Sequence, residues 1–186
     1  MLDKAITFAA AAHKDAKRKG LSQPYIFHPL EVLSLVSLMS DDQETLCAAV
    51  LHDTVEDTDV ASEDIRREFS DKVAALVGSE TEDKRGQVNK EGTWAIRKQE
   101  TIDRICAIDD LSAKMICLAD KVSNLRSLHM MKLEYGDETF NFFNQKDPKM
   151  HYWYYSELAK ALKDLEDQVV YKEYMFLIDA VFAEYL

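Results

Sequence analysis

Glycine and proline are scarce in this chain, and their scarcity limits the folds open to it. Only 5 glycines and 3 prolines occur among 186 residues. Sandwiches and barrels need turn signals roughly every 8–12 residues. The sequence also contains no glycine-rich phosphate loop and no alternation of strand and helix patterns. We therefore predict an all-α bundle of about 8–10 helices, forming a single domain over residues 1–186.

Charge and composition exclude several kinds of partner. The chain has 23 basic and 34 acidic side chains, a formal net charge of −11, which disfavours a nucleic-acid partner because phosphate backbones favour clustered Lys and Arg. It has no signal-peptide pattern and no apolar run of about 18 residues, so we expect no membrane contact. Its cysteines are Cys47, Cys106 and Cys117, an odd number without CxxC spacing. This usage predicts a reduced, cytoplasmic setting.

Periodicity and end signals place the helices. We expect helices over 2–19, 29–39, 94–108, 150–166 and 169–184, with Gly20 ending the first and His28 at the N-cap edge of the second. Further N-terminal signals are a capping-box variant from Asp41 to Glu44 and caps at Ser62, Asp71 and Ser112. The helix after Ser112 carries an apolar stripe of Met115, Leu118, Val122 and Leu125. Loops are expected from 79 to the helix at 94, and around 134–149.

The segment LHDTVEDT is the most informative stretch for chemistry. His52 and Asp53 are adjacent, and Glu56 and Asp57 follow at the spacing that places them on the same side of a helix. Carboxylates crowded in this way are costly unless a cation neutralises them. A metal site would need further ligands from elsewhere in the chain. A set of two imidazoles and two carboxylates would suit Mn²⁺, Fe²⁺ or Zn²⁺. The absence of cysteine ligands favours manganese, with His28 and Asp120 as candidate further ligands.

A His-Asp pair alone is common, and an Asp on a helix is usually a surface residue. The ordered set is more specific, because His28 is followed by His52-Asp53 and then by Asp120. This order resembles the HD phosphohydrolase superfamily. The stretches AAHKDAKRKG, QPYIFHPLEV, AAVLHDTVEDT and ICLADKVSNLRSL are similar to the hydrolase domain of RelA/SpoT-type proteins in its small stand-alone form. The resemblance covers about residues 1–130 well and the remainder more weakly.

The resemblance implies an HD-domain helical bundle and a specific chemistry. The metal ligands would be His28, His52, Asp53 and Asp120, holding one Mn²⁺. Glu56 and Asp57 would position and activate water. The implied reaction removes pyrophosphate from the 3′ position of guanosine tetra- or pentaphosphate, a small-molecule substrate, and leaves GDP or GTP.

The resemblance also implies substrate contacts. Arg18 and Lys19 match a basic pair that faces the substrate, although a basic run is also typical of a solvated helix C-terminus. Tyr25 is a separate case, because only its position before His28 suggests that it shapes the nucleoside pocket, and ordinary packing in the core is the alternative. Asn124 and Tyr154 would contact the substrate, with Tyr155 as the rival of Tyr154. We expect His13, His129 and His151 not to be ligands, with His13 the nearest to an exception.

Two alternatives are open at this point. The same site could act on another phosphorylated nucleotide, such as NADPH, a 3′-phosphonucleotide or an adenosine alarmone, because fold and ligands do not fix the base. A non-catalytic binder that retains the fold is a third hypothesis, although no expected ligand is missing. The sequence leaves the base preference and the oligomeric state open.

Overall fold

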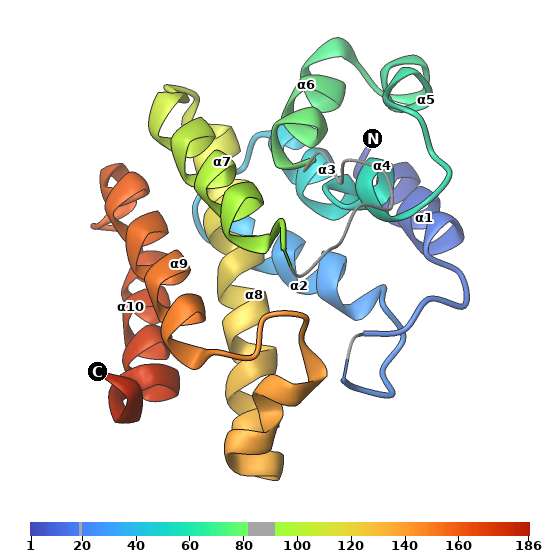
Figure 1. Ribbon diagram of the computed structural model, residues 1–186. Helices are drawn as coiled ribbons and strands as arrows, with labels where there is room; N and C mark the ends of the chain where they lie inside the picture. Colours follow the sequence, from blue (N-terminus) through green and yellow to red (C-terminus); the bar gives the residue numbers. More distant parts are fainter. Residues whose placement is uncertain (19, 82–91) are drawn as a thin grey trace. The chain divides into compact units, whose positions relative to one another are not determined.

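The computed structural model describes residues 1–18, 20–81 and 92–186, and its elements are helices (Figure 1). They are α1 (Leu2–Ala12), α2 (Phe27–Val36), α3 (Gln43–Leu51), α4 (Thr54–Asp57), α5 (Ser62–Glu68), α6 (Asp71–Glu80), α7 (Trp94–Ala107), α8 (Leu111–Tyr135), α9 (Pro148–Ala161) and α10 (Val169–Phe182), with 3-10 helices η1 (Gly136–Phe142), η2 (Lys163–Leu165) and η3 (Ala183–Tyr185). The described residues contain no strand, only an isolated bridge between Lys17 and Pro24. The all-α prediction is confirmed.

The described residues divide into two compact units. The first unit comprises Met1–Thr81 and Asp110–Asp120, and the second comprises 92–109 and Lys121–Leu186. Helix α8 contributes to both units. The prediction of a single domain over residues 1–186 stays a prediction. No helix of the described residues is long and apolar enough to cross a membrane.

Helix α3 is the core of the first unit. It packs against α1, α2 and α6, and every residue from Thr45 to Leu51 is buried. The helix's own side chains from Leu46 to Leu51 are all apolar or small. A helix that is apolar on every side is expected to have no solvent-exposed face. The buried helix ends at His52, which is its C-cap and only 1% exposed. The core therefore fixes the position of one candidate metal ligand.

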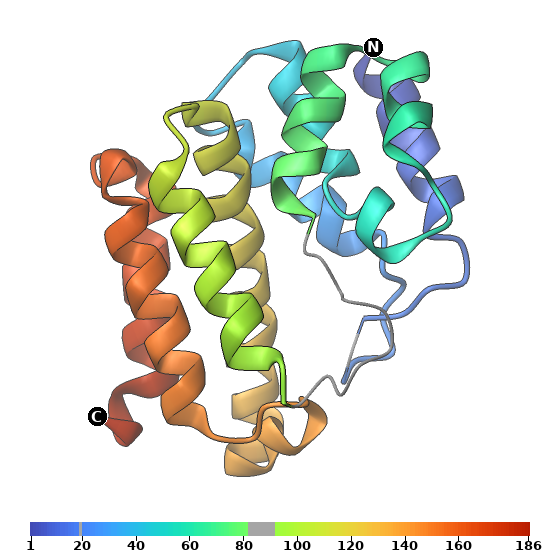
Figure 2. The ribbon, with the colours of Figure 1, turned by 45° about the horizontal axis from the view of Figure 1, so that its top comes forward.

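In the second unit α9 packs against both α7 and α10 (Figure 2). Arg126 of α8 pairs with Glu173 of α10 through two hydrogen bonds of 2.6 and 2.8 Å. His151 lies among the rings of Trp94, Phe140 and Phe143. Its Nε2 is 2.9 Å from the Gln145 carbonyl oxygen, and because that oxygen can only accept, the Nε2 donates. His151 therefore lies buried in the core with its Nε2 hydrogen-bonded, and its expected role as a non-ligand stays a prediction.

The predicted helix caps were wrong by one or two residues. The side chains that cap α3 and α6 belong to Asp42 and Ser70, which accept from the backbone N–H groups of Thr45 and Val73 at 3.0 and 3.1 Å, not to Asp41 and Asp71. Both capping residues have extended backbone, as an N-cap requires.

Two other helix starts also differ from the prediction. Helix α8 begins after Asp110, whose carboxylate accepts from the N–H of Ser112 at 2.8 Å. Helix α5 has Ala61 at its N-cap, and Asp64 accepts from the Ala61 N–H at 3.0 Å. Ser62 and Ser112 are therefore helical residues and not caps. A run of several capable acceptors allows neighbouring starts, and the sequence does not choose between them.

The first helix is shorter than predicted, because α1 ends at Ala12 instead of residue 19. Asp15 adopts a left-handed φ of 65°, which turns the chain out of the helix. The Tyr25 N–H then bonds to the Ala16 carbonyl at 2.8 Å, and the Arg18 N–H to the Gln23 carbonyl at 3.0 Å. Arg18 therefore belongs to a loop, and the interpretation of the basic run as a solvated helix C-terminus was wrong.

Helix α2 begins earlier than predicted and also ends earlier, at Val36. His28 is its second residue, within the first turn and not at the N-cap edge. Pro29 is tolerated next to it because first-turn N–H groups have no intrahelical partner. The expected loop at 134–149 contains η1, and the helix predicted over 150–166 ends at Ala161. The loop predicted from residue 79 falls largely on 82–91, outside the described residues, and α6 continues to Glu80.

Candidate functional site

Three buried side chains from three helices of the first unit meet at one point. His28 comes from α2, His52 ends α3, and Asp120 lies in α8. The two Nε2 atoms are 3.2 Å apart, and Asp120 Oδ1 is 3.2 Å from that of His28 and 3.8 Å from that of His52. The ligand atoms of the three residues all lie within 4.8 Å of one another. This group could hold a metal ion.

Asp53 brings a second carboxylate to the same place. Its Oδ2 is 3.1 Å from Nε2 of His52 and 3.3 Å from Nε2 of His28. The structure therefore brings together the residues predicted as ligands from the sequence, namely His28, His52, Asp53 and Asp120. We call these four residues the ligand cluster.

The other ring nitrogen of His52 fixes its orientation. Nδ1 lies 2.8 Å from the Ala49 carbonyl oxygen. A carbonyl oxygen only accepts, so Nδ1 carries the proton and donates. The neutral ring then presents the lone pair of Nε2 to the ligand cluster. A backbone carbonyl behind a metal-binding imidazole is the usual arrangement in metal sites.

Electrostatics at the ligand cluster favour positive charge. Burial lowers the pKa of His52, but the carboxylates of Asp53 and Asp120 outweigh burial and raise that pKa to about 9. Burial likewise raises the pKa of Asp53, but the imidazoles of His52 and His28 outweigh it and hold this pKa well below its usual range. A buried carboxylate, Asp120, and a half-buried one, Asp53, face two imidazole nitrogens, which fits a divalent cation with N and O ligands.

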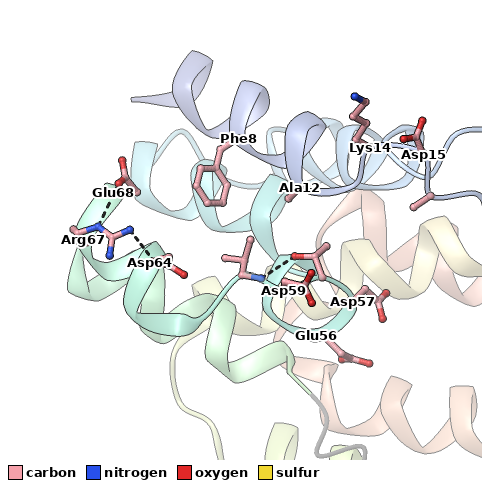
Figure 3. A pocket seen from close by; sticks show the side chains of 13 residues that line it. Phe8, Ala12, Lys14, Asp15, Glu56, Asp57, Asp59, Asp64, Arg67 and Glu68 are labelled. Atoms are coloured by element: carbon pink, nitrogen blue, oxygen red, sulfur yellow. Dashed lines mark hydrogen bonds and ion pairs between the residues drawn. The ribbon is translucent and has the colours of Figure 1, made fainter.

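Glu56 and Asp57 lie on α4, which begins directly after His52 and Asp53 of the ligand cluster. They line one side of an open pocket of about 830 Å³, and the other lining residues come from α1, α5 and the segments that follow α1 and α4 (Figure 3). The lining carries further carboxylates from Asp15, Asp59, Asp64 and Glu68, and its cations are Lys14 and Arg67. Arg67 is already paired with Asp64 and Glu68. The excess of carboxylates makes this pocket unsuited to a polyphosphate. No residue of the ligand cluster is among its lining residues.

Tyr25 has hydrogen-bond partners that the sequence did not reveal. Its hydroxyl lies 2.5 Å from Oδ2 of Asp53 and 3.0 Å from Oδ2 of Asp57. Burial, together with these two carboxylates, raises the pKa of the hydroxyl, which therefore stays protonated as a donor. The prediction of a nucleoside contact rested on the residue's place before His28. No periodicity or spacing signal relates Tyr25 to Asp57.

The ring of Tyr25 lies among three other side chains. The His13 ring is 4.8 Å away and the His28 ring 5.7 Å away, measured between centroids, and the Arg18 guanidinium carbon is 5.8 Å from the centroid of Tyr25. Burial lowers the pKa of His13. This residue is 4% exposed, and its Nε2 is buried without a hydrogen-bond partner among the described residues. His13 is not part of the group of His28, His52 and Asp120 that could hold a metal ion.

The remaining predicted contacts are distributed differently. Arg18 is half-buried in the first unit, and Lys19 lies outside the described residues. Asn124 of α8 and Tyr154 of α9 belong to the second unit. Tyr154 is 3% exposed, and Lys98 Nζ lies 4.8 Å from its ring centroid. The sequence carried no motif that singled out Lys98. The roles of these residues as substrate contacts stay predictions.

The chain belongs to the HD domain family, whose sequence profile matches residues 5–145. It is 30% identical over 176 residues to a protein of Aquifex aeolicus named guanosine-3′,5′-bis(diphosphate) 3′-pyrophosphohydrolase, a match over 92% of this chain and 24% of that protein. It is 35% identical over 135 residues to a GTP pyrophosphokinase of Streptomyces coelicolor, over 72% of this chain and 15% of the relative. The chain thus spans about a quarter or less of the length of these curated relatives.

Two solved structures are similar over nearly their whole length. One, described as a metazoan ortholog of SpoT that hydrolyzes ppGpp, gives a TM-score of 0.75 at 26% identity and covers 98% of this chain and 94% of its own. The other is lmo0812 from Listeria monocytogenes EGD-e, with a TM-score of 0.72 at 30% identity, covering 90% of this chain and 99% of its own. The predicted HD-domain helical fold and the resemblance to SpoT-like hydrolases are confirmed.

Proposed function

We propose that this chain is a metal-dependent phosphohydrolase that removes the 3′-pyrophosphate of guanosine tetra- or pentaphosphate. Water is the second substrate, and the products are GDP or GTP and pyrophosphate. The observation that carries the proposal is the similarity to the solved structure of a SpoT ortholog that is described as hydrolysing ppGpp. The similarity covers 98% of this chain. The convergence of the ligand cluster in the first unit supports it.

We propose one Mn²⁺ per chain, held by His28, His52, Asp53 and Asp120. The nitrogen and oxygen donor set supports a borderline or hard divalent ion, and no cysteine belongs to the group formed by His28, His52 and Asp120. A bound divalent ion would lower the pKa of a water molecule and polarise a phosphoryl oxygen.

The protein's own carboxylates supply proton transfer in this proposal. Glu56 and Asp57 follow Asp53 by one helical turn on α4, and a carboxylate there accepts the proton of the attacking water. Asp57 shares the Tyr25 hydroxyl with Asp53, which keeps Asp57 beside the ligand cluster. Arg18 and Lys19 are proposed to neutralise the phosphates, while Asn124 and Tyr154 are the other proposed substrate contacts.

The test uses protein stripped of metal by a chelator and then supplied with Mn²⁺ and guanosine 3′,5′-bispyrophosphate. Ion-exchange chromatography of the products should show GDP and pyrophosphate in equal amounts. An Asp53→Asn variant with unchanged circular dichroism is the matched control and should give neither product. Absence of products from wild-type protein with Mn²⁺ bound would contradict the substrate assignment, and NADPH would be the next substrate to test.

We also propose a cytoplasmic location. It is supported by cysteine usage, because Cys47 and Cys117 are buried free thiols and Cys106 is an exposed one. Thiols that do not pair are typical of reducing compartments.

A further inference from the structure

One hydroxyl connects a predicted metal ligand to a predicted catalytic carboxylate. Tyr25 is half-buried, and its hydroxyl lies 2.5 Å from Asp53 Oδ2 and 3.0 Å from Asp57 Oδ2. Asp53 is at the N-cap of α4, and Asp57 is the last residue of that four-residue helix. A helix this short does little to hold its own end, because one helical turn is marginal without outside contacts. Tyr25 supplies such a contact from a separate loop.

We propose that Tyr25 is a positioning residue, whose hydroxyl holds the carboxylates of Asp53 and Asp57 in a fixed relation. This inference rests on the proposed function. A hydroxyl has one proton, so Tyr25 can donate fully to only one carboxylate at a time, and the shorter distance identifies Asp53 as the main acceptor. That bond orients the Asp53 oxygen that faces both imidazoles.

The surroundings of the ring support a positioning role over a substrate contact. The ring of Tyr25 lies against the rings of His13 and His28, at 4.8 and 5.7 Å. The Tyr25 N–H is also bonded to the Ala16 carbonyl oxygen at 2.8 Å. Backbone and ring are thus both fixed, and the hydroxyl is already engaged with two carboxylates. A side chain held in this way is suited to orienting its acceptors.

The first test is Tyr25→Phe, which removes the hydroxyl and leaves the ring. We expect Mn²⁺ affinity of the substrate-free protein, measured by calorimetry, to fall about 10- to 100-fold, the usual effect of removing a group that orients a metal ligand. We expect kcat for ppGpp to fall, measured at saturating Mn²⁺, and KM to stay within about twofold. Tyr171→Phe is the matched control, because the Tyr171 hydroxyl donates to the Ala159 carbonyl at 2.8 Å in the second unit. The control should change neither Mn²⁺ affinity nor kcat.

The connection to Asp57 is tested by a double-mutant cycle. If the hydroxyl acts through Asp57 as well as Asp53, Tyr25→Phe should reduce kcat less in an Asp57→Asn background than in the wild type. Equal losses in both backgrounds would overturn the Asp57 part. Unchanged Mn²⁺ affinity with a raised KM would overturn the positioning role and make Tyr25 a substrate contact.

If the proposed function is wrong, the turnover and Mn²⁺-affinity measurements give a different pattern of results. A wild-type chain that binds Mn²⁺ and does not turn over ppGpp contradicts the substrate assignment. The Mn²⁺ affinities of wild type and Tyr25→Phe still decide the positioning role, because that measurement contains no substrate. Equal affinities in the two proteins would overturn the role in that case as well.

Discussion

The Nε2 atoms of His28 and His52 lie 3.2 Å apart. His52 donates its Nδ1 proton to Ala49, so its Nε2 is an acceptor when the ring is neutral. A second acceptor at this distance is repulsive unless a proton or a cation lies between the two nitrogens. Asp53 Oδ2, within 3.3 Å of both nitrogens, adds negative charge to the same point. The two histidines and Asp53 are therefore placed to face a cation. Metal binding should affect both the stability of the folded chain and the rate of substrate turnover.

Metal binding should stabilise the folded chain. A ligand that binds only the native state, present at 100 times its dissociation constant, adds about 2.7 kcal/mol to the free energy of unfolding. Chelator-treated protein should therefore unfold at a lower temperature than the same protein with Mn²⁺. Thermal unfolding followed by circular dichroism checks this, and in Asp120→Asn the Mn²⁺-dependent shift should largely disappear. An equal shift in both proteins would place the bound ion elsewhere.

Replacing Asp53 by Asn should remove activity without unfolding the chain. The change deletes the carboxylate that faces both imidazoles, and we expect kcat to fall by more than about 100-fold, beyond the usual effect of changing a group that only supports a ligand. Helical circular dichroism should be retained, because Asp53 contributes no side-chain cap to α4. Asp59→Asn, an exposed position a few residues later, should keep wild-type kcat. Substantial activity in Asp53→Asn would contradict the proposed ligand role.

Glu56→Gln should separate proton transfer from metal binding. Glu56 is close in sequence to the ligand cluster but is not part of it, so Mn²⁺ affinity should change by less than about twofold. Loss of a general base typically lowers the rate by about 10²- to 10⁴-fold, and kcat should fall within that range. Steady-state kinetics and calorimetry on the same preparation provide both values. The exposed Glu63→Gln on α5 is the matched control, and a normal kcat in Glu56→Gln would assign the base role to another group.

The sequence predicted that the four residues of the ligand cluster lie together, and the structure places them together. His52 and Asp53 stand out from the sequence because an apolar helix leads into them, whereas His28 and Asp120 were joined to them by the resemblance to the HD superfamily. The connection from Tyr25 to Asp57 could not be predicted. It depends on the chain leaving α1 at Ala12 and turning through the left-handed Asp15, and an Asp carries only a weak signal for that conformation.

Helix boundaries illustrate the same limit. Asp41 and Asp42 are equally capable N-caps by residue type, and only the structure shows that Asp42 accepts from Thr45. What separates the two is a tertiary contact, because Lys72 of α6 bonds to Asp42 at 2.8 Å. Local propensity gives the approximate start of a helix, and packing between helices selects the residue.

That cap provides a prediction about pH. Hydrogen bonds from Lys72 and Thr45 lower the pKa of Asp42 from 3.8 to about 2. A carboxyl whose pKa is lower in the folded state stabilises the fold fully above its unfolded pKa, and this contribution is lost as pH falls through its folded pKa. The side chain is 42% exposed, so solvent screening limits the ion pair, and loss of the cap should cost about 1 kcal/mol near pH 7.

Asp42→Ala should therefore be less stable than wild type at pH 7, and the difference should narrow as pH falls from about 4 towards 2. Urea unfolding at several pH values measures both quantities. Asp41→Ala is the matched control, because Asp41 is the neighbouring exposed carboxylate and not the cap, and it should cost less than about 0.5 kcal/mol at every pH. A larger effect of Asp41→Ala than of Asp42→Ala would restore the start of α3 that the sequence alone suggested. A difference for Asp42→Ala that stays constant down to pH 2 would show that its carboxylate charge adds nothing to the cap.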